Sequence, residues 1–116
     1  MPKTPTVSDL LKKKSAASKP GTPLLEEAHV RAVLRGLPGW KLADKEISKT
    51  YPFKNYYETL AFVNATAWIS HHQDHHPDLE VGYNKCRVRY STHSIGGISE
   101  SDLICAAKVE ALAASS

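Results

Sequence analysis

The sequence predicts an α+β fold in which three helices pack on one face of a four-stranded antiparallel sheet, in the order α-β-β-α-β-β-α. Three observations carry this prediction: apolar residues recur at helical spacing, turn residues separate two pairs of short strand-like segments of which the second pair alternates apolar and polar residues, and a helix-capping motif follows that pair. Such an arrangement is typical of a helical layer on an antiparallel sheet. A chain of 116 residues is long enough for one domain with a small core.

Residues 1–21 differ in composition from the rest of the chain. They are rich in Lys, Ser, Thr and Pro and contain only the short apolar pair Leu10-Leu11, which predicts a disordered basic tail before a single domain at residues 22–116. Of the net charge of +3, five lysines against Asp9 give the tail +4, which leaves −1 for the domain. A nearly neutral domain lacks the basic face of a nucleic-acid-binding protein. A targeting or binding arm is the alternative interpretation of the tail.

Two further features concern the environment of the protein. No segment has the apolar length of a secretory signal or of a membrane span, so we expect no membrane partner. Cys86 and Cys105 lack the spacing of a disulfide framework, which favours reduced thiols in a cytoplasmic protein.

The first helix is predicted to begin at Thr22, a candidate N-cap followed by Pro23, and to end at Gly36. Its apolar residues recur at i, i+3, i+4 and i+7, namely Val30, Val33, Leu34 and Leu37. Turn residues at 38–39 and 44–45 then predict two short strands at 40–43 and 46–53, joined as a hairpin.

The second helix carries four histidines within residues 71–76. Asn55 and Glu58 predict a capping box at its start, and Pro77 predicts its end near His76. A helical wheel has a polar side made of Thr59, Thr66, Ser70 and Gln73. The opposite, apolar half contains the histidines together with Leu60, Ala61, Ala65 and Trp68.

Histidines on an apolar helix face favour a pocket in which imidazoles exchange protons near neutral pH. Two alternatives stay open from the spacing alone. The i, i+4 pairs His71/His75 and His72/His76 could chelate a metal, although the His-Glu-x-x-His pattern is absent. A histidine such as His72, taken alone, could also be an ordinary core residue.

The second pair of strands is predicted at 78–83 and 85–92, with a turn at Asn84. Every second residue is apolar or aromatic, which gives each strand one buried face: Leu79, Val81 and Tyr83, then Cys86, Val88 and Tyr90. Ser99 and Asp102 then predict a capping box that opens the last helix, and Asp102 could serve as a cap alone.

Several of these residues together resemble the signature of the pterin-4a-carbinolamine dehydratases. The resemblance covers about residues 22–112 and rests on Gly39-Trp40, His75-His76-Pro77, Tyr83-Asn84-Lys85, Ser91-Thr92-His93, Gly97 and Asp102 at their spacings. It implies dehydration of a 4a-hydroxytetrahydropterin, the product of an aromatic amino acid hydroxylase, to quinonoid dihydropterin and water. The implied role is recycling of the pterin cofactor.

The resemblance also implies a site. It makes His75, His76 and His93 the catalytic set, with His75 and His93 in the acid and base roles in undecided order and His76 binding and polarising the substrate. The implied substrate-binding residues are Asp74, Trp40, Pro77, Thr92, Asp102 and His71. A solvated carboxylate is the alternative for Asp74, and an ordinary core residue is the alternative for Trp40. No metal or other cofactor is expected.

The sequence departs from the family pattern in places. His71 stands where many members carry Glu, so a fixed carboxylate role there is in doubt; the other departures are Leu79, Ser101 and Ile95. Family resemblance implies a homodimer or homotetramer. Two other functions are open: a transcription-factor partner, which some animal members have, and metal binding by the histidine cluster.

Overall fold

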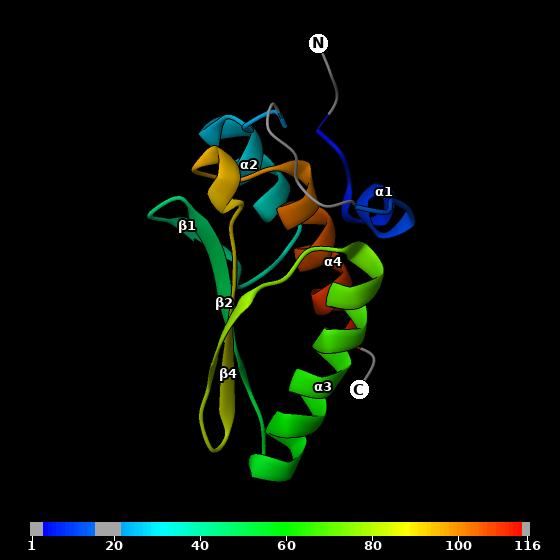
Figure 1. Ribbon diagram of the computed structural model, residues 1–116, viewed down its shortest axis with the longest axis vertical. Coiled ribbons are helices and arrows are strands. Elements are labelled where there is room, and N and C mark those ends of the chain that lie inside the picture. Colours follow the sequence, from blue (N-terminus) through cyan, green and yellow to red (C-terminus); the bar gives the residue numbers. More distant parts are fainter. Residues whose placement is uncertain (1–3, 16–21, 115–116) are drawn as a thin grey trace.

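Four antiparallel strands form one sheet in the computed structural model, which describes residues 4–15 and 22–114 (Figure 1). The strands lie in the order β1-β2-β4-β3, with bounds β1 Lys41–Ala43, β2 Glu46–Pro52, β3 Asp78–Val81 and β4 Lys85–Tyr90. Asp44 and Lys45 both have positive φ in the turn between β1 and β2, as a tight two-residue hairpin requires. The strands predicted from alternation are therefore confirmed, to within a few residues at their ends.

The two faces of the sheet differ as predicted on β2 and β4. On the edge strand β3 the predicted buried face is wrong, because only Leu79 is partly buried and both Val81 and Tyr83 are exposed. Ile47 and Tyr51 on β2 pair with Tyr90 and Cys86 on β4, and all four side chains are buried. The alternate residues of the two strands point to the other face, where Arg89 of β4 binds Glu46 of β2 through two hydrogen bonds of 2.9 and 3.0 Å. One face therefore packs on the core and the other carries charges.

The helices lie on the buried side of the sheet (Figure 1). Their bounds are α1 Val7–Lys12, α2 Glu27–Leu34, α3 Tyr56–Gln73 and α4 Glu100–Ala114, and a short 3-10 turn, η1, spans His93–Ile95. The α+β class and the order α-β-β-α-β-β-α are confirmed for α2 to α4. Among the described residues, no helix is both long enough and apolar enough to cross a membrane.

Helix α1 lies within the stretch for which the sequence predicts a disordered tail. Thr6 and Asp9 cap it reciprocally, and Leu10 is completely buried. The composition of residues 4–15 is polar, but one leucine inserted into the core of the domain and two capping bonds order the segment. The rest of the tail prediction, for residues 1–3 and 16–21, lies outside the described residues.

Helix α2 begins five residues later than predicted. Residues 22–26 are not helical, and the amide of Leu25 donates to the carbonyl of Ile98 at 2.9 Å. This segment therefore pairs with the chain before α4. The helix does not begin at Thr22-Pro23, as the sequence predicted. The apolar face of the helix is as predicted, because Val30, Val33 and Leu34 are buried.

Helix α3 buries the side that the wheel marked as polar. Thr59, Thr66, Ser70 and Gln73 are buried, whereas Trp68 is 64% exposed and Leu60 is also exposed. The hydroxyl groups of Thr59, Thr66 and Ser70 donate to backbone carbonyls one turn earlier, at 2.7 to 3.0 Å. Hydroxyl groups satisfied in this way can be buried at little cost. The prediction that α3 buries its Trp68 side is therefore wrong.

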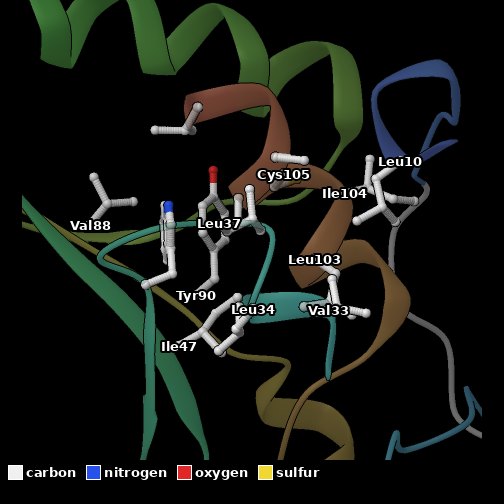
Figure 2. Packing of buried hydrophobic residues seen from close by; sticks show 14 of the residues in the cluster. Leu10, Val33, Leu34, Leu37, Ile47, Val88, Tyr90, Leu103, Ile104 and Cys105 are labelled. Atoms are coloured by element: carbon white, nitrogen blue, oxygen red, sulfur yellow. The ribbon is translucent and has the colours of Figure 1, made fainter. Parts of the chain in front are cut away.

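The core lies between the sheet, α4 and the shorter helices. Figure 2 shows Val88 and Tyr90 of the sheet in the same buried cluster as Leu103, Ile104 and Cys105 of α4. Both cysteines are free, and burial raises the pKa of the Cys105 thiol to about 12 and that of the Cys86 thiol above its usual value. The predicted unpaired thiols are present, and they stay protonated near neutral pH.

A carboxylate near the end of α4 ties this helix to the sheet. Oε1 of Glu110 accepts hydrogen bonds from Lys49 at 2.8 Å, the Tyr51 hydroxyl at 2.6 Å and the Trp40 indole at 3.3 Å. Burial alone raises the pKa of Glu110, but the hydrogen bonds from Lys49 and Tyr51 outweigh it, so the pKa lies below its ordinary value.

Replacing Glu110 by Gln is expected to lower the free energy of unfolding at pH 7 by about 1–3 kcal/mol, as for other hydrogen bonds to charged groups. A carboxyl with a depressed folded pKa stabilises above its unfolded pKa, and this stabilisation is lost as the pH falls through the folded value. Urea unfolding should therefore show the two proteins converging as the pH falls below the ordinary value of 4.5. A constant difference across this range would contradict the assignment.

Candidate active site

His75 and Asp102 form a buried pair at the centre of the candidate site. His75 Nε2 lies 2.5 Å from Asp102 Oδ1, and Asp102 is fully buried. Helix α3 ends at Gln73, and Asp74 takes left-handed backbone angles, φ 51° and ψ 41°. This reversal turns the chain out of the helix at the residue directly before His75. The prediction that the helix continues to His76 is therefore wrong, and the reversal separates His75 from His71 and His72, which lie on α3.

The second carboxylate oxygen of Asp102 accepts hydrogen bonds from two residues of the segment before α4. Oδ2 accepts the Ser99 amide at 2.9 Å and the Thr92 hydroxyl at 2.7 Å. The carboxylate-to-amide bond is the one predicted from the capping motif. Asp102 is thus both a helix cap and the partner of His75, and Thr92, which follows the end of β4, is tied to His75 through it.

Tyr90 supports the other side of the His75 ring. The two ring centroids lie 5.8 Å apart with an interplanar angle of 14°. Burial raises the pKa of Tyr90, so the phenol stays neutral beside the histidine. Sequence reasoning placed Tyr90 in the core but missed this role. Its position on the inner face of β4, two residues before Thr92, was the available signal.

The other two predicted catalytic histidines are exposed. The side chain of His93 is 85% exposed, and its Nε2 lies 3.9 Å from Oδ2 of Asp78, the first residue of β3. His76 is exposed and directly follows His75. The start of β3 and the end of β4 are neighbours in the sheet, because Asp78 pairs with Arg89. The fold therefore brings residues 75–78 and 92–93 to one edge of the molecule.

The remaining histidines of the cluster lie apart from the buried pair. His72 stacks on exposed Trp68, with 3.8 Å between ring centroids, and His71 is exposed on the same helix. Because α3 ends at Gln73, the i, i+4 geometry assumed for two chelating pairs does not hold. Within residues 4–15 and 22–114, no three His, Cys, Asp or Glu side chains are grouped to hold a metal ion.

The other predicted site residues fall into two groups. Asp74 is exposed and Pro77 is half-buried, and both border His75 and His76 along the chain. Trp40 is buried in the core, where its ring lies 6.3 Å from that of Tyr90. Trp40 therefore adopts the core position that was its alternative interpretation, and its ring lies beside Tyr90, the ring that stacks on His75.

The arrangement suits proton exchange at a surface site. One imidazole is fixed by a carboxylate and an aromatic ring, as in sites where a buried acid sets the orientation and tautomer of a catalytic histidine. Two further imidazoles are open to solvent: His76, the next residue in the chain, and His93, beside the first residue of β3. Such a set can deliver and accept protons on a small molecule bound at this edge.

Comparisons with known proteins are consistent with this chemistry. Residues 23–112 match the family described as "Pterin 4 alpha carbinolamine dehydratase". A protein of Nitrosomonas eutropha with the name "Putative pterin-4-alpha-carbinolamine dehydratase" is 55% identical over 107 residues, which cover 91% of this chain and 95% of that protein. A protein of the same name from Bdellovibrio bacteriovorus is 52% identical over 110 residues, covering 91% and 89% of the two chains.

Two solved structures share the fold. A protein of Brucella melitensis described as a transcriptional coactivator/pterin dehydratase is 32% identical and superposes with a TM-score of 0.74, covering 78% of this chain and 99% of that one. A second protein, described as a pterin dehydratase-like RuBisCO assembly factor of the alpha-carboxysome, is 28% identical with a TM-score of 0.54. It covers 66% of this chain and 89% of its own.

Proposed function

The chain belongs to the pterin-4-alpha-carbinolamine dehydratase family, whose members are hydro-lyases, and on this premise we propose that His75 and His93 carry the proton transfers of the dehydration. The proposed substrate is a 4a-hydroxytetrahydropterin, and the products are quinonoid dihydropterin and water. We further propose that the reaction recycles the pterin cofactor of an aromatic amino acid hydroxylase.

The reaction needs two proton transfers. The bond between C4a and the hydroxyl oxygen breaks, the oxygen gains a proton and leaves as water, and N5 loses a proton as the new double bond forms. Each of these transfers can be assisted by an imidazole, and each positioned acid or base typically contributes about 10²–10⁴-fold in rate.

The single observation that carries the proposal is the bond between His75 Nε2 and Asp102 Oδ1. A carboxylate accepts hydrogen bonds, so it favours the tautomer of neutral His75 with hydrogen on Nε2. That tautomer leaves the lone pair on Nδ1. We therefore assign His75 as the base that removes the proton from N5.

His93 is then assigned as the acid. Its ring is exposed beside Asp78, with 3.9 Å between His93 Nε2 and Asp78 Oδ2, at the same edge of the sheet as His76. An exposed side chain can also exchange its proton with solvent between turnovers. In this assignment His93 delivers a proton to the departing hydroxyl group.

The remaining residues are proposed to hold the substrate or the histidines. His76 is exposed next to His75 and is assigned to substrate binding and polarisation. Asp74, Pro77 and His71 are proposed to line the bound pterin on the α3 side. Thr92 and Asp102 are buried, so we assign them to holding His75 through their mutual hydrogen bond. A homodimer or homotetramer and a cytoplasmic location stay predictions.

Replacing His76 by Ala is expected to raise the KM for the carbinolamine several-fold and to lower kcat less than loss of His75 does. The reason is that His76 is assigned to binding and polarisation and not to a full proton transfer. Initial rates of quinonoid dihydropterin formation, corrected for the uncatalysed reaction, measure both constants. His72→Ala is the matched control, because His72 lies on the exposed face of α3 against Trp68. Equal kinetics for the two variants would remove His76 from the site.

A further inference from the structure

The segment at residues 6–15 is hydrogen-bonded to the C-terminal end of α3, two residues before the proposed catalytic residue His75. Residues 6–15 lie before the stretch that matches the family, residues 23–112. Even so, α1 packs beside α4 and the C-terminal end of α3 (Figure 1). We call residues 6–15 the strap.

Three contacts attach the strap to α4 and the core. Leu10 is completely buried in the main hydrophobic cluster. The Lys108 ammonium donates to the carbonyl of Leu11 at 2.8 Å, and Lys13 pairs with Glu100 at 3.1 Å. The Lys13 pair and the Lys108 bond are both exposed, so the buried Leu10 is the stronger attachment.

The end of the strap caps α3. Ser15 and Gln73 are both buried, and the Ser15 amide donates to Oε1 of Gln73 at 2.8 Å. The Ser15 hydroxyl donates to the backbone carbonyl of Gln73, the last residue of α3. The last carbonyls of a helix have no partner within the helix, so a distant serine here supplies the missing donor.

The peptide that Ser15 holds is the one from which the chain turns toward His75. The carbonyl of Gln73 belongs to the same peptide unit as the amide of Asp74, the left-handed residue. One residue later, the His75 amide donates to the carbonyl of Ser70 at 3.2 Å, and the ring reaches Asp102. The Asp102 and Tyr90 contacts fix the far end of His75, and the Ser15 contact fixes the backbone from which it extends.

We propose that Ser15 is a positioning residue for His75, and that the strap holds the C-terminal end of α3 in the conformation required for proton transfer. The proposal rests on the assigned role of His75 in the dehydratase reaction. Small displacements of a catalytic group are enough to matter, because a shift of about 1 Å can cost up to 10²-fold in rate. Supporting residues outside the substrate contact are a common means of fixing such groups.

The test compares Ser15→Ala and Ser15→Thr with Ser8→Ala, in the full chain. Ser8 is exposed on α1, so its variant is the matched control for removing a hydroxyl group from the strap. The readouts are kcat and KM for the carbinolamine, and the ring signals of His75 in NMR spectra of the enzyme without substrate. We expect Ser15→Ala to lower kcat about tenfold with little change in KM and to shift the His75 ring signals. Ser15→Thr, which keeps the hydroxyl, should restore both.

Two results would overturn the proposal. One is a Ser15→Ala enzyme with the kcat and His75 signals of Ser8→Ala, and the other is a Ser15→Thr enzyme as impaired as Ser15→Ala. If the intact protein does not accelerate dehydration at all, the proposed function fails instead. The His75 signals of Ser15→Ala and Ser8→Ala then still decide whether the strap positions this ring.

Discussion

Replacing His75 and His93 together by Ala is expected to remove nearly all enzymic dehydration of the carbinolamine. Each histidine is assigned one proton transfer, and each such transfer is worth about 10²–10⁴-fold, so the double variant should approach the uncatalysed rate. The measurement is the initial rate of quinonoid dihydropterin formation from freshly generated 4a-hydroxytetrahydropterin, after subtraction of the background.

The single variants His75→Ala and His93→Ala distinguish a loss of catalysis from a loss of folding stability. His75→Ala removes the partner of a buried carboxylate and is expected to destabilise the protein, whereas the His93 side chain is 85% exposed and its loss should leave the fold intact. His93→Ala is therefore the cleaner test of catalysis. A folded double variant that retains a large fraction of the intact rate would exclude both assignments.

Replacing Asp102 by Asn is expected to lower kcat by about 10²-fold or more while the fold is kept. The Ser99 amide and the Thr92 hydroxyl both donate to Oδ2, so the amide oxygen of Asn takes that position and its NH2 group faces His75. His75 Nε2 would then have to accept a hydrogen bond, which moves the ring hydrogen to Nδ1. A histidine with hydrogen on Nδ1 cannot accept the N5 proton there.

Two measurements check this prediction. Steady-state rates give the loss in kcat, and nitrogen NMR of the His75 ring reports which nitrogen carries hydrogen. Ser99→Ala is the control, because it removes a hydroxyl near the same carboxylate and leaves the backbone amide bond in place. If Asp102→Asn kept the intact rate, Asp102 would be a helix cap alone, the alternative that the sequence left open.

The sheet could be predicted from sequence because its signal is local. Strict alternation in residues 85–90, and Ile47 and Tyr51 at alternate-face spacing in residues 46–52, with turn residues between strands, indicate the strands and their inner faces. The α+β class follows from the order of these elements. The capping bond between Ser99 and Asp102 could also be predicted, since its donor and acceptor are three residues apart.

The buried side of α3 could not be predicted from a wheel. Thr59, Thr66 and Ser70 count as polar, but their hydroxyl groups are satisfied by carbonyls of their own helix, and Thr59 also donates to the carbonyl of Tyr83 at 2.9 Å. Trp68 counts as apolar, yet it lies outside against His72. A helical wheel takes account of residue types alone. It does not include the hydroxyl-to-carbonyl hydrogen bonds that allow Thr and Ser side chains to be buried.

The candidate site depends on contacts between distant segments. Asp102 meets His75 across 27 residues, and Ser15 meets Gln73 across 58. Family resemblance supplied His75, His93 and Asp102 as site residues, and the assignment of their roles stays a proposal. The Tyr90 support and the Ser15 contact carry no local motif, which is why sequence reasoning missed both.

The most direct test of the account is the rate at which the intact protein converts freshly generated 4a-hydroxytetrahydropterin to quinonoid dihydropterin, measured against the uncatalysed rate in the same buffer. The account predicts acceleration that rises in proportion to protein concentration and falls to near background in the His75→Ala, His93→Ala double variant. A folded, intact protein that adds nothing to the background rate would contradict it.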